Sequence, residues 1–550
     1  MKACVPDETR TSVPGKKRAW LIGCIVFVLA FDLVFVWQRT GGAYRSEFGG
    51  HPDEAAHYVT GLFVRDSLLM AGRYVTGGCK GSPIQAGKDF ADRYYTHYPK
   101  ISLGVWPPFF YLVQSAWTLP LSPSRTSVLL LLGALAAAVA AMLFRALRDE
   151  YGIWLAALGA ALLVSLPLFR LSSGMVMAET LSALLMFGAA LAFGDFLDRE
   201  KRADALRFGV FAALAILTKG TGLALALAAP LALIFTRRFH LLKRPALWWG
   251  VLIVALVAGP WTWATRNLGR GGWVEPGPSW NFTREAVPYY ATKFGLGLGV
   301  LALLLFCVGA FVKVRARSQN QGRWAAAGAL IIAVIVFQSI APVGLEARHL
   351  VPTLPAAMMF AVAGFAALLN RPSSEAAPAA RNRPVISAAL GLVVLAGSVW
   401  PLAEKGFSGF APLAEAMLAE AAPADVTLVS SDARGEGMFI SEIAMREQRP
   451  GHVIQRASKS LAKSAWSGSG YSPVFSTDDD LLAFLTSGKI QYLVLDDSLP
   501  EDKRREHHDQ LKRLVEEHSD LFWLVASADL FRGGERQHAL VRLYKIQRPK

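Results

Sequence analysis

Long apolar runs recur along this chain and constrain its fold more than any other feature of the sequence. A helix needs about 20 mostly apolar residues to cross a bilayer. Eleven segments approach this length, at residues 19–37, 127–147, 153–169, 179–197, 206–218, 221–235, 247–264, 293–312, 324–341, 350–369 and 385–401. The sequence therefore predicts a mainly α-helical, polytopic membrane domain.

The amino-acid composition excludes two classes of protein. Charged residues make up 18% of the 550 residues and hydrophobic residues 53%, whereas a typical soluble domain has about 25% charged residues. A soluble globular chain is therefore excluded, and so is a disordered chain, which needs low hydrophobicity and dense charge. The formal net charge of +15 would suit nucleic acid in a soluble protein, but in a membrane protein such an excess marks cytoplasmic loops. No nucleic-acid partner is predicted.

Basic residues set the orientation of the predicted spans. If the N-terminus is cytoplasmic and the spans alternate, the cytoplasmic segments carry 22 Lys and Arg residues and the short outer loops carry six. This asymmetry is the positive-inside pattern. The first span resembles a signal peptide, but it contains Asp32 and no cleavage site follows it, so an uncleaved anchor is predicted. The sequence predicts a multi-pass protein of the plasma (inner) membrane with a cytoplasmic N-terminus.

Two long segments fall outside the membrane by the same alternation. The loop 38–126 contains an amphipathic stretch, 53–70, and an aromatic stretch, 105–119, both predicted to be helices at the membrane surface. The tail 402–550 instead alternates short β-rich runs with helical stretches, which is typical of a small α/β domain. The predicted domains are a membrane domain, 1–401, and an extracytoplasmic α/β domain, 402–550.

The elements of that tail can be placed from its sequence. Strands are predicted at 426–430, 490–495, 522–526 and 539–544, and helices near 436–446, 478–487 and 501–518.

Ionisable residues gather in the segments predicted to face the outer membrane surface. They are Asp53, Glu54, Arg170, Glu179, Lys219, Arg266, Glu346, Arg348 and His349. Such residues are costly near a membrane and imply a function. A carboxylate can act as the base for a nucleophile, and fixed cations stabilise a departing anion such as phosphate. The set suits a reaction that deprotonates an acceptor and expels an anionic leaving group.

Six short motifs in this chain resemble those of a known family. His51-Pro52-Asp53-Glu54 resembles the first-loop acidic motif of the GT-C glycosyltransferases, and more narrowly of the lipid A aminoarabinose transferase and protein O-mannosyltransferase (PMT-like) family. The others follow in the matching order, as Trp106-Pro107-Pro108-Phe109-Phe110-Tyr111, Met177-Ala178-Glu179-Thr180, Leu217-Thr218-Lys219-Gly220, Pro260-Trp261 and Glu346-Ala347-Arg348-His349-Leu350. The resemblance covers roughly residues 19–401.

The resemblance implies transfer of a sugar from a polyprenyl-phosphate donor at the outer membrane surface, with inversion at the anomeric carbon. It implies a catalytic set of Asp53 as the base, Glu179 as a supporting carboxylate and Glu54 as a neighbouring structural carboxylate. It also implies that the donor phosphate is held by Lys219, Arg266, Arg348 and His349. The family often has a cation before the proline pair, where this chain has Trp106, and Lys100 is the candidate substitute.

Simpler interpretations exist for several of these residues. Asp53 and Glu54 also suit the start of a helix, Lys219 suits a lysine that snorkels to the interface, and Arg266 suits a solvated loop. Asp53 and Glu179 could share a divalent cation through oxygen ligands. The sequence shows no third ligand, so no metal or other cofactor is predicted.

Two other classes of function compete with the transferase. A transporter or flippase for lipid-linked or anionic solutes would also have about a dozen spans and buried charges, but the chain shows no internal repeat and its charges cluster on one membrane face. An assembly scaffold would leave the outer carboxylates and cations unexplained. The identity of the sugar stays open, and so does the acceptor, which is a lipid, a glycan or a protein.

Overall fold

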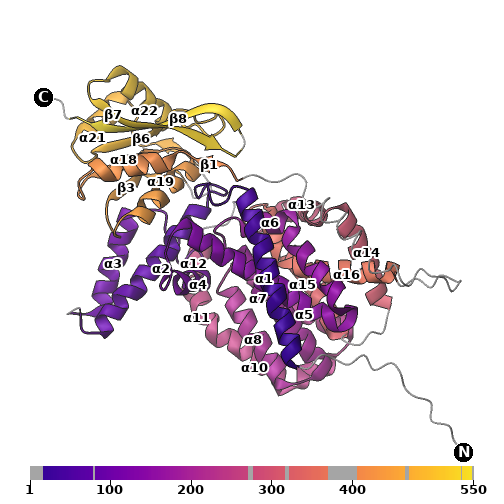
Figure 1. Cartoon of the computed structure of the whole chain (residues 1–550). Coiled ribbons are helices and arrows are strands. Elements are labelled where there is room, and N and C mark those ends of the chain that lie inside the picture. Colours follow the sequence, from indigo (N-terminus) through magenta and orange to yellow (C-terminus); the bar gives the residue numbers. More distant parts are fainter. Residues whose placement is uncertain are drawn as a thin grey trace, which may run out of the picture.

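The computed structural model describes residues 16–78, 81–270, 277–315, 321–369, 405–464, 470–533 and 535–547. The described part up to residue 369 is helical, and its named strands all lie between residues 407 and 546. Figure 1 shows a helical bundle beside a smaller part that contains the sheet, drawn in orange and yellow. The predicted mainly α fold with a C-terminal α/β part is confirmed.

Apolar helices that pack against one another build the bundle. α1 (Lys16–Thr40) packs along α5 (Arg125–Ser165), while α7 (Glu179–Arg199) contacts both α8 (Arg202–Ile216) and α15 (Gln321–Ile340). The other helices are α6 (Pro167–Ser173), α9 (Leu225–Thr236), α10 (Pro245–Val257), α11 (Gly259–Ala264), α12 (Arg266–Arg270), α13 (Trp280–Leu298), α14 (Val300–Arg315) and α16 (Leu354–Leu369), with 3-10 turns η1 (Gly220–Ala224), η2 (Phe239–Lys243) and η3 (Ala347–Thr353).

Glycines allow the helices to approach closely or change direction. A Cβ on Gly309 of α14 would lie 1.9 Å from the carbonyl oxygen of Phe360 in α16, so this crossing requires a residue without a side chain. Within α5, Gly152 has φ 78° and ψ 170°, which breaks the helix between the predicted spans 127–147 and 153–169.

Five described helices are long and apolar enough to cross a membrane, at Trp20–Thr40, Arg125–Ser165, Glu179–Arg199, Gln321–Ile340 and Ala347–Leu369. A sixth would combine α13 and α14, which meet at 105°. The predicted span 293–312 runs across this bend, because hydropathy records composition and not chain direction. The predicted spans 206–218, 221–235 and 247–264 correspond to shorter helices, and 385–401 lies outside the described residues. The count of eleven therefore stays a prediction.

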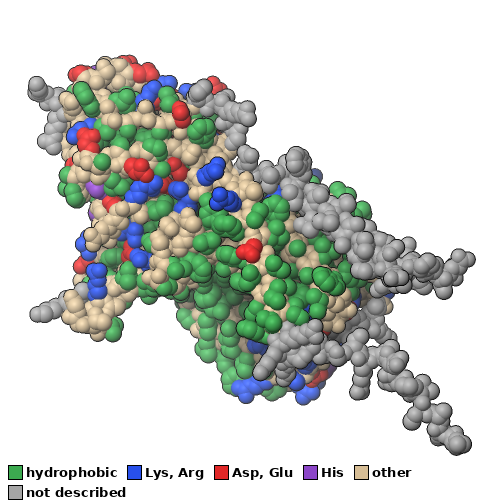
Figure 2. Space-filling view, in the orientation of Figure 1, with side chains coloured by type: hydrophobic (Ala, Val, Ile, Leu, Met, Phe, Trp, Pro, Cys, Tyr) green, Lys and Arg blue, Asp and Glu red, His purple; other side chains and the backbone are tan. Residues whose placement is uncertain are grey.

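Different kinds of side chain cover different parts of the molecular surface. Figure 2 shows hydrophobic side chains covering the flank of the bundle, Lys and Arg gathered at its lower end, and mixed charges on the sheet-containing part. Ion pairs such as Arg238–Asp198 (3.4 Å) and Arg244–Glu200 (2.8 Å) connect segments predicted to be cytoplasmic.

The segment 38–126, predicted to be the first outer loop, contains three helices, α2 (Glu54–Val75), α3 (Pro83–His97) and α4 (Phe109–Thr118). α2 and α4 coincide with the predicted amphipathic and aromatic stretches. The first half of α2 is buried against α4 and the C-terminal part, so this half does not lie on a membrane surface as predicted. α3 was not predicted, because its sequence is polar on average and has no long apolar run.

The C-terminal part is a six-stranded sheet with strand order β1-β7-β8-β6-β2-β3. β2 (Val426–Ser430) pairs in parallel with β3 (Val453–Arg456) and β6 (Tyr492–Asp496), whereas β8 (Glu535–Ile546) runs antiparallel between β6 and β7 (Phe522–Arg532). The other elements are β1 (Phe407–Ser408), β4 (Ala462–Lys463), β5 (Ser472–Pro473), α18 (Phe410–Glu420), α19 (Ala433–Arg446), α20 (Ala457–Ser460), α21 (Asp478–Thr486) and α22 (Glu506–Glu517). The four predicted strands and three predicted helices all overlap these elements.

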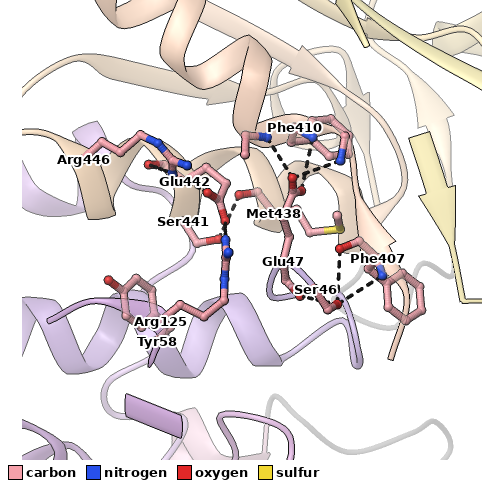
Figure 3. A network of polar contacts seen from close by, with 12 residues as sticks. Ser46, Glu47, Tyr58, Arg125, Phe407, Phe410, Met438, Ser441, Glu442 and Arg446 are labelled. Atoms are coloured by element: carbon pink, nitrogen blue, oxygen red, sulfur yellow. Dashed lines mark hydrogen bonds and ion pairs between the residues drawn. The ribbon is translucent and has the colours of Figure 1, made fainter. Parts of the chain in front are cut away.

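Buried charges join the C-terminal part to the first outer loop (Figure 3). Glu47 accepts hydrogen bonds from the backbone N–H groups of Gly409 (2.9 Å), Phe410 (3.2 Å) and Ala411 (2.8 Å) at the start of α18. Glu442, on α19, is fully buried and pairs with Arg125 at the start of α5. Because each carboxylate has partners across the boundary, the two parts are fixed relative to each other.

Candidate functional site

The guanidinium group of Arg348 contacts three carboxylates from segments predicted to face the outer membrane surface. Together with Lys219, these residues are called the Arg348 cluster. Nη2 of Arg348 is 3.0 Å from Oδ2 of Asp53, its Nη1 is 3.2 Å from Oε1 of Glu179, and its Nε and Nη2 both contact the carboxylate of Glu346. Arg348 therefore joins three carboxylates that come from distant segments of the chain.

Helix starts position the acidic residues of this cluster. Asp53 is the N-cap residue of α2 and Glu179 is the first residue of α7, where negative charge is favoured by the helix dipole. Lys219 precedes η1, and its Nζ donates to Oε1 of Glu179 at 2.6 Å. The other oxygen of Glu179, Oε2, is buried without a hydrogen-bond partner in the described part of the chain.

Glu346 connects the cluster to His51. The distance from His51 Nε2 to Glu346 Oε2 is 3.1 Å, and the distance from His51 Nδ1 to Asp53 Oδ2 is 3.5 Å. Burial alone would raise the pKa of Glu346, but hydrogen bonds from His51 and Arg348 outweigh this effect and hold the pKa below its ordinary range. Glu346 is therefore ionised at neutral pH.

An aromatic wall lies next to Asp53. His57, one turn further along α2, stacks on Trp106 with ring centroids 4.0 Å apart, and its Nδ1 is 2.8 Å from the hydroxyl of Tyr111. Burial lowers the pKa of His57 to about 3, although Glu179 and Asp53 oppose this shift. The imidazole is thus neutral, and it makes a polar contact with Tyr111 among these aromatic side chains.

Glu54 lies apart from the Arg348 cluster, although it directly follows Asp53. Its carboxylate accepts hydrogen bonds from the backbone N–H groups of Gly50 (2.8 Å) and Val176 (3.0 Å) and pairs with the buried Lys405. Glu54 thus joins the first outer loop to the segments before α7 and before β1.

Three of the predicted phosphate ligands also lie elsewhere. Lys100 is half-buried, and its Nζ donates to the carbonyl of Ala433 in the C-terminal part at 2.9 Å. Arg266 is exposed and lies over the ring of Trp263. His349 is buried, and its Nδ1 is 3.0 Å from the hydroxyl of Tyr290. Of the predicted cations, Lys219 and Arg348 are the two that contact the carboxylate cluster.

The space between Asp53 and Glu179 is taken by the Arg348 guanidinium. Among the described residues, no group of three or more His, Cys, Asp and Glu side chains is arranged to hold a metal ion.

The arrangement combines the two functions that acid–base transfer chemistry needs. A carboxylate at the surface of the cluster can accept a proton, and a guanidinium with a neighbouring ammonium can hold an anionic group. Asp53 is 18% exposed in its side chain, whereas Glu179 is 2% exposed. Asp53 is thus the more accessible of these two carboxylates.

Comparison with known proteins finds a matching family model and several solved structures with a similar fold. Residues 106–263, which include Glu179 and Lys219, match the family described as dolichyl-phosphate-mannose-protein mannosyltransferase. A search of curated proteins gave no match. The fold is similar to that of ArnT from Cupriavidus metallidurans, solved in the apo state and bound to undecaprenyl phosphate, at 15% sequence identity. In both cases the TM-score is 0.63, with 96% of this chain and 98% of that chain covered.

The chain thus has a fold similar to that of ArnT, and residues 106–263 match the mannosyltransferase family model. The archaeal oligosaccharyltransferase AglB from Archaeoglobus fulgidus is a more distant match, at 13% identity and a TM-score of 0.49, with 87% of this chain and 70% of that chain covered. The resemblance drawn from the six motifs is confirmed. The family match and the fold together support a membrane glycosyltransferase.

Sequence reasoning did not assign a role to His51, His57 or Glu346. His51 is part of the acidic motif and Glu346 starts the last motif, so their positions were visible. Their contacts depend on α2 and η3 meeting in space, which no local pattern in the sequence reports.

Proposed function

We propose that the protein transfers a sugar from a polyprenyl-phosphate donor to an envelope lipid, glycan or protein acceptor at the outer membrane surface, with inversion. The observation that carries this proposal is the contact of one guanidinium, from Arg348, with both Asp53 and Glu179. An anion site and a potential base thereby lie within one side-chain length of each other.

In the proposed step, an acceptor hydroxyl attacks the anomeric carbon of the sugar. Its oxygen forms the new glycosidic bond while Asp53 accepts its proton, and the bond from the anomeric carbon to the donor phosphate oxygen breaks. The electron pair of that bond leaves with the polyprenyl phosphate. Attack from the side opposite the departing phosphate inverts the anomeric carbon.

Arg348 and Lys219 would stabilise the negative charge that develops on the departing phosphate. Glu179 contacts both cations and is almost completely buried, so it would orient them. Lys100, Arg266 and His349 contact neither Asp53 nor Glu179 by any hydrogen bond or ion pair described for them, so we assign them no direct part in the step.

The proposed orientation follows from the basic residues and from the position of the site. The Arg348 cluster lies on segments predicted to be outside, and the 22 Lys and Arg residues counted above lie on segments predicted to be cytoplasmic. We propose an enzyme of the plasma (inner) membrane with its C-terminal α/β part outside.

The transporter alternative receives less support from this geometry. A transporter commonly binds its solute near the middle of the membrane between repeated halves, whereas the Arg348 cluster joins the starts of α2, α7 and η3, which the sequence predicts on one membrane face.

The test is transfer of radiolabelled sugar from polyprenyl phosphate into envelope acceptors by wild type and Asp53→Asn. We expect Asp53→Asn to lower turnover by about 10²–10⁴-fold, the usual contribution of a general base, while the protein still inserts and binds its donor. Mass spectrometry of envelope glycolipids and glycoproteins with and without the protein would identify the sugar and the acceptor. Wild-type turnover by Asp53→Asn would contradict the proposed role of Asp53.

A further inference from the structure

The contacts of Arg348 are unevenly distributed over its guanidinium. Glu346 occupies the edge formed by Nε and Nη2, with one carboxylate oxygen on each nitrogen, whereas Asp53 and Glu179 each contact a single nitrogen. Arginine binds carboxylate and phosphate in a bidentate manner through an edge formed by two of its nitrogens. Glu346 therefore lies where an anionic ligand would bind best.

The charge of the cluster opposes a further anion. Asp53, Glu179 and Glu346 contribute three negative charges, against two positive charges from Arg348 and Lys219. A phosphate added to this set would lie next to carboxylates with an excess of negative charge, which is unfavourable. Binding of phosphate at Arg348 requires one carboxylate to withdraw.

Burial and anchoring indicate which carboxylate withdraws. The side chain of Glu179 is 2% exposed and also binds Lys219, and Asp53 is fixed at the start of α2. The side chain of Glu346 is 34% exposed, and its backbone lies in the short connection between α15 and η3. Glu346 also has a second partner, since its Oε2 is 3.1 Å from His51 Nε2. It can leave Arg348 without losing every partner.

We infer that Glu346 holds the place of the donor phosphate on Arg348: a lipid phosphate displaces Glu346 from the Nε–Nη2 edge, and Glu346 stays with His51. The inference rests on the proposed function, because it assumes that Arg348 binds the donor phosphate. In the empty enzyme Glu346 neutralises a guanidinium that is 13% exposed. Glu346 thus sets the affinity for the donor by competition, without taking part in bond formation.

The test measures binding of undecaprenyl phosphate to the full-length protein in detergent, with undecaprenol as the ligand that lacks the phosphate. Glu346→Gln keeps the size of the side chain and removes its charge, so we expect roughly tenfold tighter binding of undecaprenyl phosphate and unchanged binding of undecaprenol. Glu285→Gln is the matched control, because Glu285 is an exposed carboxylate on α13 in the same outer region. We expect it to bind like wild type.

Arg348→Ala separates this inference from the proposed function. If Arg348→Ala weakens binding of undecaprenyl phosphate at least tenfold and Glu346→Gln strengthens it, both stand. If Arg348→Ala weakens binding but Glu346→Gln leaves it unchanged or weaker, the place-holding role of Glu346 is wrong and the donor site remains. If Arg348→Ala has no effect, both are wrong. A gain of affinity that depends on the phosphate cannot result from a damaged fold.

Discussion

Nη2 of Arg348 lies 3.0 Å from Oδ2 of Asp53, although the two residues are 295 positions apart in the chain. The contact joins the first outer loop to the turn before α16. Because Nη1 of the same guanidinium binds Glu179 at the start of α7, it fixes three separate helix starts with one planar group. The shape of the side chain matters here as well as its charge.

We predict that Arg348→Lys lowers turnover by at least about tenfold even though it keeps the positive charge. A lysine ammonium is a point charge and cannot present a planar fork to several anions at once. The measurement is the rate of sugar transfer and the donor concentration for half-maximal rate. Arg266→Lys is the matched control, since Arg266 is exposed and contacts the carbonyl and the ring of Trp263. An equal loss with Arg266→Lys would place the donor near α12 instead.

Glu54→Gln should act on stability before it acts on chemistry. Glu54 is fully buried, and its carboxylate is the ion-pair partner of Lys405, whose side chain is 6% exposed. Removing one member of a buried pair typically costs about 3–5 kcal/mol in the free energy of unfolding. Thermal unfolding of the purified protein measures this loss.

The double variant Glu54→Gln/Lys405→Met checks the cause of that loss. It should recover part of the stability, because no buried charge is then left without a partner. Full stability of Glu54→Gln together with lost turnover would instead move Glu54 into the reaction.

Gly437→Val should loosen the C-terminal part from the first outer loop. A Cβ at Gly437, on α19, would lie 3.0 Å from the Cβ of Ala55 and 2.8 Å from Cε of Lys100. Overpacking of this kind costs roughly 1–3 kcal/mol, and Ala55 directly follows the Asp53-Glu54 pair. We expect a lower melting temperature and lower turnover. Gly406→Val is the control and should change both values less, because a Cβ at Gly406 would have no atom within 4 Å.

The stability of the protein should depend on pH through Glu47. Burial raises the pKa of Glu47 from 4.5 to about 7, with a further contribution from Glu442 and an opposing one from three backbone N–H groups. Between these pH values the folded state binds more protons than the unfolded state, so this group's contribution to stability falls as pH rises from 4.5 to 7. Glu47→Gln removes that dependence. The melting temperature of Glu47→Gln relative to wild type should therefore increase between pH 5 and pH 8.

Glu415→Gln provides the comparison for that experiment. Glu415 is an exposed carboxylate on α18, paired with Arg446 at 3.2 Å. Its melting temperature relative to wild type should change little over the same range. A constant difference for Glu47→Gln across the range would contradict the assigned role of Glu47.

Regular patterns in the sequence predicted most of the elements correctly. The run 426–430 is β2, residue for residue, because a buried strand leaves a short apolar signature with clear limits. The bend between α13 and α14 was not predicted, since Gly299 takes a φ of 77° that composition does not reveal. α3 was missed because a polar amphipathic helix resembles a loop when only hydropathy is considered.

In the candidate site, too, the sequence predicted which segments carry the charged residues but not which of these residues contact one another. The spacing of the apolar runs predicts Asp53, Glu179, Lys219 and Arg348 on one side of the membrane, and these four residues do lie together in the structure. Arg266 has the same charge and the same predicted side of the membrane, yet it points to solvent. Sequence alone does not distinguish such cations, because the distinction depends on how η3 packs against α7.

The position of β8 in the sheet has a consequence for biosynthesis. β8 follows every other described strand in chain order, but it lies between β6 and β7 in the interior of the sheet. During synthesis, β6 and β7 have no shared neighbour until residues 535–546 have left the ribosome. The contacts that α18 and α19 make with Glu47 and Arg125 involve a sheet that is still incomplete until then. Completion of the sheet is thus a late event, and a nascent chain arrested before β8 would carry open sheet edges that can pair with other chains.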